Sequence, residues 1–77
     1  MIIRSKDGRC IMEFKYLKSM EVIELALSGR CFIRAKLDGL SAEEDVFIGE
    51  YDSVENAQKD LDYIIDKYLD DANFVRL

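Results

Sequence analysis

The segment that decides the fold of this chain is DSVENAQKDLDYIIDKYLD, residues 52–70. Its apolar residues recur every three or four positions, which is the period of an amphipathic helix that packs one side on a core. They are Val54, Ala57, Leu61, Ile64, Ile65, Tyr68 and Leu69. Two helix starts fit a capping box, Asp52 with Glu55 or Ser53 with Asn56. Either start predicts a helix over about residues 53–70, about 27 Å long.

Before this helix the chain consists of short runs that are rich in β-branched, aromatic and aliphatic residues. The runs span residues 2–5, 10–17, 21–27, 31–37 and 46–51. Turn residues separate them, at Asp7-Gly8, at Ser28-Gly29, at Asp38-Gly39 and, more weakly, at Lys18-Ser19-Met20. The sequence therefore predicts an α+β fold, a four- or five-stranded antiparallel β-meander packed on one C-terminal α-helix.

Alternation along each run predicts which side chains face the core. The predicted core side chains are Cys10, Met12, Phe14 and Tyr16 in the second run, Ile23, Leu25 and Leu27 in the third, and Cys31, Ile33, Ala35 and Leu37 in the fourth. The tail, residues 71–77, alternates over residues 73–77, and it leaves two alternatives open: an edge strand or a contact with a second subunit.

Size and composition limit the organisation of the chain. With 77 residues, of which 49% are hydrophobic and 35% charged, residues 1–77 form a single small domain. No run approaches the roughly 18 apolar residues of a membrane span, and the N-terminus lacks the pattern of a secretion signal. We therefore expect a protein of the cytoplasm of a bacterial cell. In that compartment Cys10 and Cys31 are expected to be small apolar residues rather than a disulfide.

The sequence does not favour an enzyme. It contains no histidine, so it lacks the side chain best suited to general acid–base catalysis near neutral pH. Its four glycines are isolated, and they form neither a phosphate-binding loop nor a dinucleotide fingerprint. Two cysteines without histidine do not make a structural zinc site. We predict no catalytic residues, no metal and no cofactor.

Charge is distributed unevenly along the chain. Residues 1–36 carry eight basic and four acidic side chains, a net charge of +4, whereas residues 37–77 carry three basic and twelve acidic ones, a net charge of −9. Like charges four residues apart weaken a helix, as at Asp62, Asp66 and Asp70. With Asp60, these residues predict an acidic helix face that binds a basic surface of a host protein. The alternative hypothesis is a stripe that only keeps the protein soluble.

The basic first half suggests a different function. Arg4, Arg34 and Lys36 lie on the predicted open sheet face, where they could gather around a phosphate while Phe32 stacks on a base. The chain would then be a sponge for a signalling nucleotide or another anion, and a homodimer would double these groups. The alternative is a solvated sheet face whose charges neutralise one another across strands. The overall charge of −5 does not favour binding to duplex nucleic acid.

Two motifs carry a resemblance. The opening Ile2-Ile3-Arg4-Ser5-Lys6-Asp7, and the segment 48–57 followed by Leu61-Asp62-Tyr63-Ile64, resemble those of a group of small proteins of phages, prophages and Gram-positive genomes. Lys6 stands where that group usually has glutamine. The resemblance implies a meander with one helix and a phage or mobile-element setting. Short acidic proteins of that setting are often inhibitors of bacterial defence, such as anti-CRISPR proteins, or nucleotide sponges.

Overall fold

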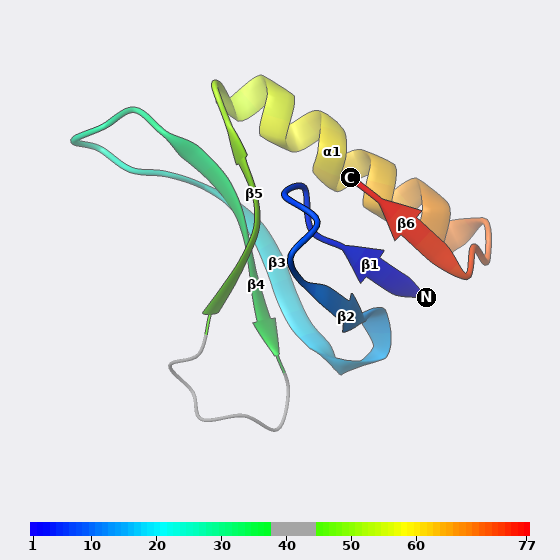
Figure 1. The fold of residues 1–77 in the computed structure, drawn as a ribbon. Coiled ribbons are helices and arrows are strands. Elements are labelled where there is room, and N and C mark those ends of the chain that lie inside the picture. The colour runs from blue at the N-terminus through cyan, green and yellow to red at the C-terminus, as the bar shows by residue number, and fades with distance from the viewer. Residues whose placement is uncertain (38–44) are drawn as a thin grey trace.

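A computed structural model of the chain describes residues 1–37 and 45–77, which form six strands, one α-helix and a short 3₁₀ turn (Figure 1). The elements are β1 (Ile2–Arg4), β2 (Ile11–Glu13), the 3₁₀ turn η1 (Phe14–Tyr16), β3 (Leu17–Glu24), β4 (Cys31–Leu37), β5 (Asp45–Tyr51), α1 (Val54–Leu69) and β6 (Phe74–Arg76). The predicted α+β class is confirmed. The predicted turn at Asp38-Gly39 lies outside the described residues.

The strands form two sheets rather than one meander. The short sheet has the order β2-β1-β6, and the long sheet has the order β3-β4-β5. The long sheet is antiparallel, but β6 pairs with β1 in parallel, Ile3 opposite Val75. The prediction of four or five meander strands is therefore wrong in number and connection. Of the two alternatives for the tail, the edge strand is the one observed.

The helix and the short sheet together cover one face of the long sheet (Figure 1). Between these layers lies one cluster of buried side chains: Ile3, Met12, Cys31, Ile33, Ala35, Ile48, Tyr51, Ala57, Ile64 and Val75. The predicted core side of the fourth run is confirmed for Cys31, Ile33 and Ala35, which are fully buried, whereas Leu37 is only partly buried. Both cysteines are free thiols, and Cys31 packs in the core as expected.

The first hairpin turns where the sequence predicts. Gly8 has a φ of 75°, a conformation that glycine adopts without strain, and β1 and β2 pair antiparallel on either side of it. The Asp7 carboxylate accepts hydrogen bonds from the Arg9 amide, at 3.0 Å, and from Ser5 Oγ, at 2.7 Å. Both bonds lower the pKa of Asp7. The turn is thus fixed by its own polar groups.

The second predicted strand is broken, which corrects the prediction for residues 10–17. The 3₁₀ turn η1 carries the chain from the short sheet to the long one, so β3 begins at Leu17. A register shift between Leu17 and Ser19 then changes which residues face inward. Met20 and Val22 pack against the core, instead of the predicted Ile23, Leu25 and Leu27.

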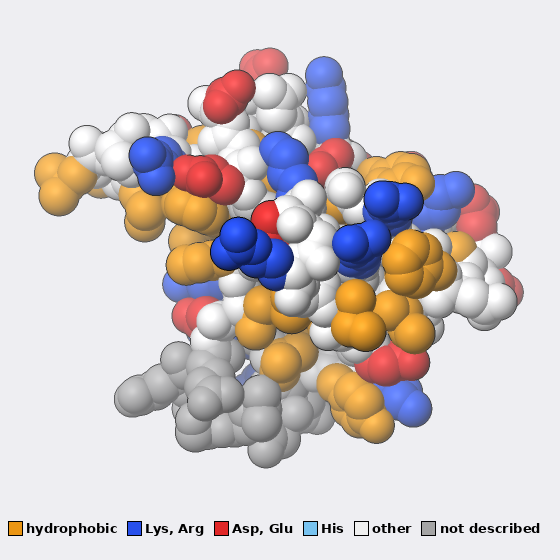
Figure 2. Space-filling model, in the orientation of Figure 1, with side chains coloured by type: hydrophobic (Ala, Val, Ile, Leu, Met, Phe, Trp, Pro, Cys, Tyr) orange, Lys and Arg blue, Asp and Glu red, His pale blue; other side chains and the backbone are white. Residues whose placement is uncertain are grey.

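The hairpin between β3 and β4 extends away from the body of the molecule (Figure 1), and hydrophobic side chains lie on this arm (Figure 2). Leu27 is fully exposed and Leu25 is 44% exposed, although both were predicted to be core residues. Tyr16, also predicted to face the core, is 56% exposed because η1 ends the alternation of β2.

The helix confirms the second of the two predicted starts. Ser53 is the N-cap, and its Oγ accepts the Asn56 amide hydrogen bond at 3.1 Å. Ala57 and Ile64 are fully buried, and Tyr68 stacks on Phe14 with ring centroids 4.3 Å apart. The helix of the described residues is neither long nor apolar enough to cross a membrane.

Candidate functional site

The outward face of α1 carries exposed carboxylates. Asp62, Asp66 and Asp70 are exposed, as predicted, and the Asp62 carboxylate accepts a hydrogen bond from Gln58 Nε2 at 3.0 Å. Among residues 1–37 and 45–77, none of the three forms an ion pair with lysine or arginine. Their negative charge is therefore directed to solvent.

Apolar side chains lie beside these carboxylates. Ile65 is 43% exposed and Leu69 is 71% exposed. With Asp62 and Asp66 they follow the spacing i, i+3, i+4 and i+7, so the four residues share one helix face. We call this set, Asp62, Ile65, Asp66 and Leu69, the acidic–apolar face. Ile65 and Leu69 were predicted to belong to the stripe that packs on the core, and their exposure corrects that prediction. The acidic–apolar face is therefore distinct from the core-packing face of Ala57 and Ile64.

The end of α1 adds negative charge where it is unfavourable. Asp70 is the C-cap of the helix, and Asp71 follows it with a φ of 57°, in the left-handed region. The C-terminus of a helix carries a partial negative charge, so carboxylates there are repelled. Glycine or asparagine is also preferred in the left-handed position. Helix stability alone would not select this pair of acids.

Asp60 does not belong to this face. It was predicted to bind the partner with Asp62, Asp66 and Asp70, but its side chain is half-buried. Its carboxylate accepts a hydrogen bond of 2.6 Å from the hydroxyl of Tyr51, a core residue that is 6% exposed. Burial, followed by this bond to Asp60, raises the pKa of Tyr51. Asp60 thus supports the packing of α1 on β5.

Loss of the Tyr51–Asp60 hydrogen bond should measurably lower the free energy of unfolding. We expect Tyr51→Phe to lower the free energy of unfolding by about 1.5 kcal/mol, because a hydrogen bond to a carboxylate is lost. Since the folded pKa of Tyr51 lies above the unfolded value near 10, its contribution is complete below pH 10 and declines above it. Urea unfolding at several pH values measures both effects.

Tyr63→Phe is the matched control, because Tyr63 is 41% exposed and should lose almost nothing. Equal losses for the two substitutions would contradict the role of the Tyr51–Asp60 bond.

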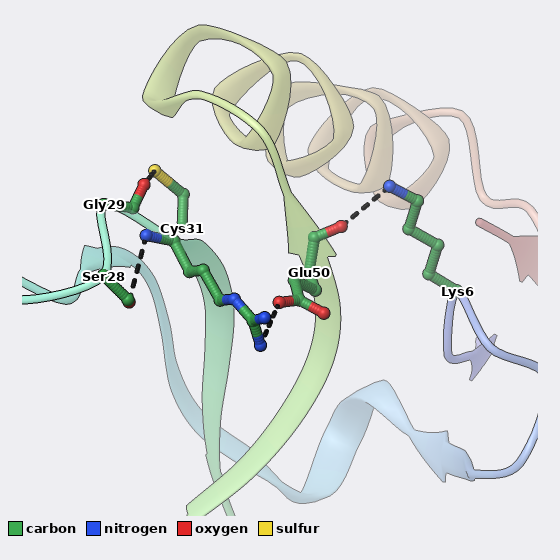
Figure 3. Close-up of polar contacts among 6 residues, drawn as sticks. Lys6, Ser28, Gly29, Cys31 and Glu50 are labelled. Atoms are coloured by element: carbon green, nitrogen blue, oxygen red, sulfur yellow. Dashed lines mark hydrogen bonds and ion pairs between the residues drawn. The ribbon is translucent and has the colours of Figure 1, made fainter.

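Lys6 connects the first hairpin to the edge of the long sheet. Its Nζ donates to the Glu50 carbonyl at 2.8 Å and lies 4.0 Å from the centre of the Tyr51 ring. Its amide also donates to the Ile48 carbonyl at 2.8 Å. Figure 3 shows Lys6 reaching Glu50 from one side of β5, while the Glu50 carboxylate points the other way. There it forms an ion pair of 3.2 Å with Arg30.

The open face of the long sheet is already neutralised. The Arg34 Nε donates to the Glu21 carboxylate at 3.0 Å, and Arg34 Nη1 lies 3.6 Å from Asp45 Oδ2. The bond and charge of Arg34 lower the pKa of Glu21. Phe32 packs against Phe47, with ring centroids 4.9 Å apart. These contacts match the alternative in which charges cancel across strands.

The predicted anion site is therefore not assembled as proposed from the sequence. Arg34, Lys36 and Phe32 share the open face of β4, whereas Arg4 lies on β1 in the other sheet. Ile3 of the short sheet and Ile33 of the long sheet both pack in the core between the sheets. Because side chains alternate along a strand, their neighbours Arg4 and Arg34 point away from the core, each on its own sheet. Within one chain, the structure therefore brings Arg34, Lys36 and Phe32 together and leaves Arg4 apart from them.

Comparison with known proteins adds no relative: no protein-family model matches the chain, and no curated protein or solved structure matches it significantly. The resemblance to phage proteins stays a prediction.

Proposed function

We propose that this chain is a non-enzymatic binding protein that presents the acidic–apolar face of α1 to a basic surface of a partner protein. The observation that carries the proposal is the combination of Asp62, Ile65, Asp66 and Leu69 on one exposed helix face. A helix with anchors at this spacing fits a groove on a partner. Apolar side chains supply contact area there, and carboxylates supply charge complementarity.

The cost of this arrangement supports a role in binding. Asp62, Asp66 and Asp70 repel one another at a spacing of four residues, and each such pair weakens a helix by about 0.2–0.5 kcal/mol. Asp70 and Asp71 add an unfavourable interaction with the helix end. Attraction between these carboxylates and a basic partner would offset their mutual repulsion. The proposal therefore explains why acids occupy positions that do not favour the isolated fold.

The partner that fits best is a protein whose basic groove receives nucleic acid. Such a groove offers clustered lysines and arginines, to which a row of carboxylates is complementary. The resemblance of the sequence motifs supports a host defence or nucleic-acid-handling protein as the target, and a phage or mobile element as the setting. The chain would act as an inhibitor by occupying the groove.

Charge reversal tests this proposal. We expect the double variant Asp62→Lys and Asp66→Lys to lower affinity for the partner at least about tenfold, since two attractive contacts become repulsive. The free energy of unfolding should change by less than about 0.5 kcal/mol, because both residues are exposed. The partner would be captured from a bacterial lysate on the wild-type protein, purified and titrated by calorimetry.

Two further measurements make the experiment specific. Lys59→Glu adds an acid on the same side of the helix and should strengthen binding, whereas Glu24→Lys on β3 should leave it unchanged. Duplex DNA should compete for the groove, and salt should weaken binding as the screening length falls from about 10 Å at 0.1 M to about 3 Å at 1 M. Equal affinities of the wild type and the double reversal would refute the proposal.

A further inference from the structure

Two arginines lie side by side on the outer face of the short sheet. The parallel pairing of β1 and β6 places Arg4 opposite Arg76. Their neighbours Ile3 and Val75 are buried, so alternation turns both arginines away from the core. Like charges directly opposite one another destabilise a sheet. The fold therefore places two arginines opposite one another, with both side chains on the outer face of the short sheet.

Neither arginine is neutralised within the described part of the chain. Arg30 and Arg34 form ion pairs with carboxylates there, whereas Arg4 and Arg76 form none. The Arg4 Nε and Nη2 reach the Gly8 carbonyl at 3.4 Å, a long contact that leaves most of the donors unused. Figure 2 shows Lys and Arg side chains next to hydrophobic ones over β1 and β6. The arginine pair is open to an anion.

A hollow of about 200 Å³ lies at this pair, lined among others by Arg4, Lys6, Asp7, Gly8 and Arg76. Asp7 is the one acidic side chain in this lining, and its carboxylate already accepts bonds from Ser5 and Arg9. Ser5 and Leu77 complete the lining. Arg4 and Arg76 thus bring two guanidinium groups to the hollow against the one acidic side chain of Asp7, while the Lys6 ammonium is held at the Glu50 carbonyl. The side chains that line the hollow therefore carry a net positive charge, although the net charge of the whole chain is −5.

We propose that this hollow binds the phosphate group of a small phosphorylated ligand such as a mononucleotide. Arginine presents a planar fork of donors that matches phosphate oxygens, and two such forks can hold one phosphate. Pockets that enclose a whole drug-sized ligand usually exceed about 300 Å³, so the hollow suits the anionic head alone. The rest of the ligand would lie over Phe74, which is 50% exposed and shares the outer face with Arg76.

This site differs from the anion site predicted from the sequence. It keeps Arg4 but replaces Arg34, Lys36 and Phe32 with residues of the first hairpin and the tail. It is also independent of the acidic–apolar face, so the double reversal at Asp62 and Asp66 should leave phosphate binding unchanged. Failure of one proposal therefore does not imply failure of the other.

Calorimetric titration with orthophosphate, adenosine monophosphate and adenosine tests the inference. We expect saturable binding of orthophosphate and of the nucleotide, and none of adenosine, which lacks the phosphate. Tighter binding of the nucleotide than of orthophosphate would show that the protein also contacts the nucleoside part of the ligand. Absence of binding by both phosphates, or equal binding of adenosine and its monophosphate, would overturn the proposal.

Substitutions assign the binding to the arginine pair. Arg76→Gln should weaken phosphate binding at least about tenfold, as expected for loss of a charge-assisted pair of hydrogen bonds. Arg4→Gln should do the same, and thermal unfolding checks that each variant folds. Arg9→Gln is the matched control, because Arg9 is exposed on the same hairpin but does not line the hollow. Wild-type affinity in Arg76→Gln would place the ligand elsewhere and refute the site.

Discussion

Replacing Val75 with aspartate is expected to cost more than about 3 kcal/mol of folding free energy and to leave little folded protein. Val75 is 1% exposed and packs in the core from β6, so the new carboxylate would be buried without a partner. A domain of this size has a total stability of about 4–12 kcal/mol, of which this is a large part. Circular dichroism during thermal and urea unfolding measures the loss.

The neighbouring substitution Phe74→Asp is the control. Phe74 is 50% exposed on the outer face of the short sheet, where the new carboxylate lies near the arginine pair. It should cost about 1 kcal/mol or less. If Val75→Asp were as stable as Phe74→Asp, the tail would not be docked beside β1, and the arginine pair would lose its basis.

The second large effect is expected at Ile64. Ile64 is fully buried between α1 and the sheets, so Ile64→Ala should lower the free energy of unfolding by about 2–5 kcal/mol, through lost burial and the cavity that remains. The adjacent Ile65→Ala should cost less than about 1 kcal/mol, because Ile65 is 43% exposed and alanine is the better helix former. Urea unfolding of both variants gives the difference.

The same pair of variants separates folding from binding. Ile65 belongs to the acidic–apolar face, so Ile65→Ala should weaken partner binding while the protein stays folded. Similar stability losses for Ile64→Ala and Ile65→Ala would mean that α1 is rotated from the position described, and the acidic–apolar face would then be wrong.

The elements with strong local signals were predictable from the sequence. The spacing of Ala57, Leu61 and Ile64 identified α1, and Ser53 was one of two possible caps. Alternation in residues 31–37 identified both faces of β4. In these elements the period of the side chains and the geometry of the backbone agree, so local rules suffice.

The remaining features depend on contacts between distant parts of the chain. The turn η1 and the register shift after Leu17 follow from the passage of the chain between two sheets. The weak turn signal at Lys18-Ser19-Met20 lies close to this point, but those residues belong to β3 and the turn itself comes earlier, at η1. The tail was recognised as alternating, but its parallel pairing with β1 requires α1 to return the chain to its starting strand. Arg76 was missed for this reason.

The candidate sites show the same division. Asp62, Asp66 and Asp70 were assigned to an outward face by helix periodicity, and the structure places them in solvent. Asp60 was not distinguished from them, because its bond to Tyr51 depends on how α1 packs on β5. Arg34 carries the positive charge that an anion site needs, but ion pairs with its cross-strand partners Glu21 and Asp45 neutralise that charge.

The contact of Lys6 with β5 has a consequence for self-assembly. The outer edge of a sheet invites strand addition by a second molecule, which is a route to ordered aggregates. Here the Ile48 and Glu50 carbonyls on that edge already accept bonds from Lys6, and its charged amine stands beside them. The first hairpin thus occupies part of the β5 edge through Lys6, which hinders the addition of a further strand there.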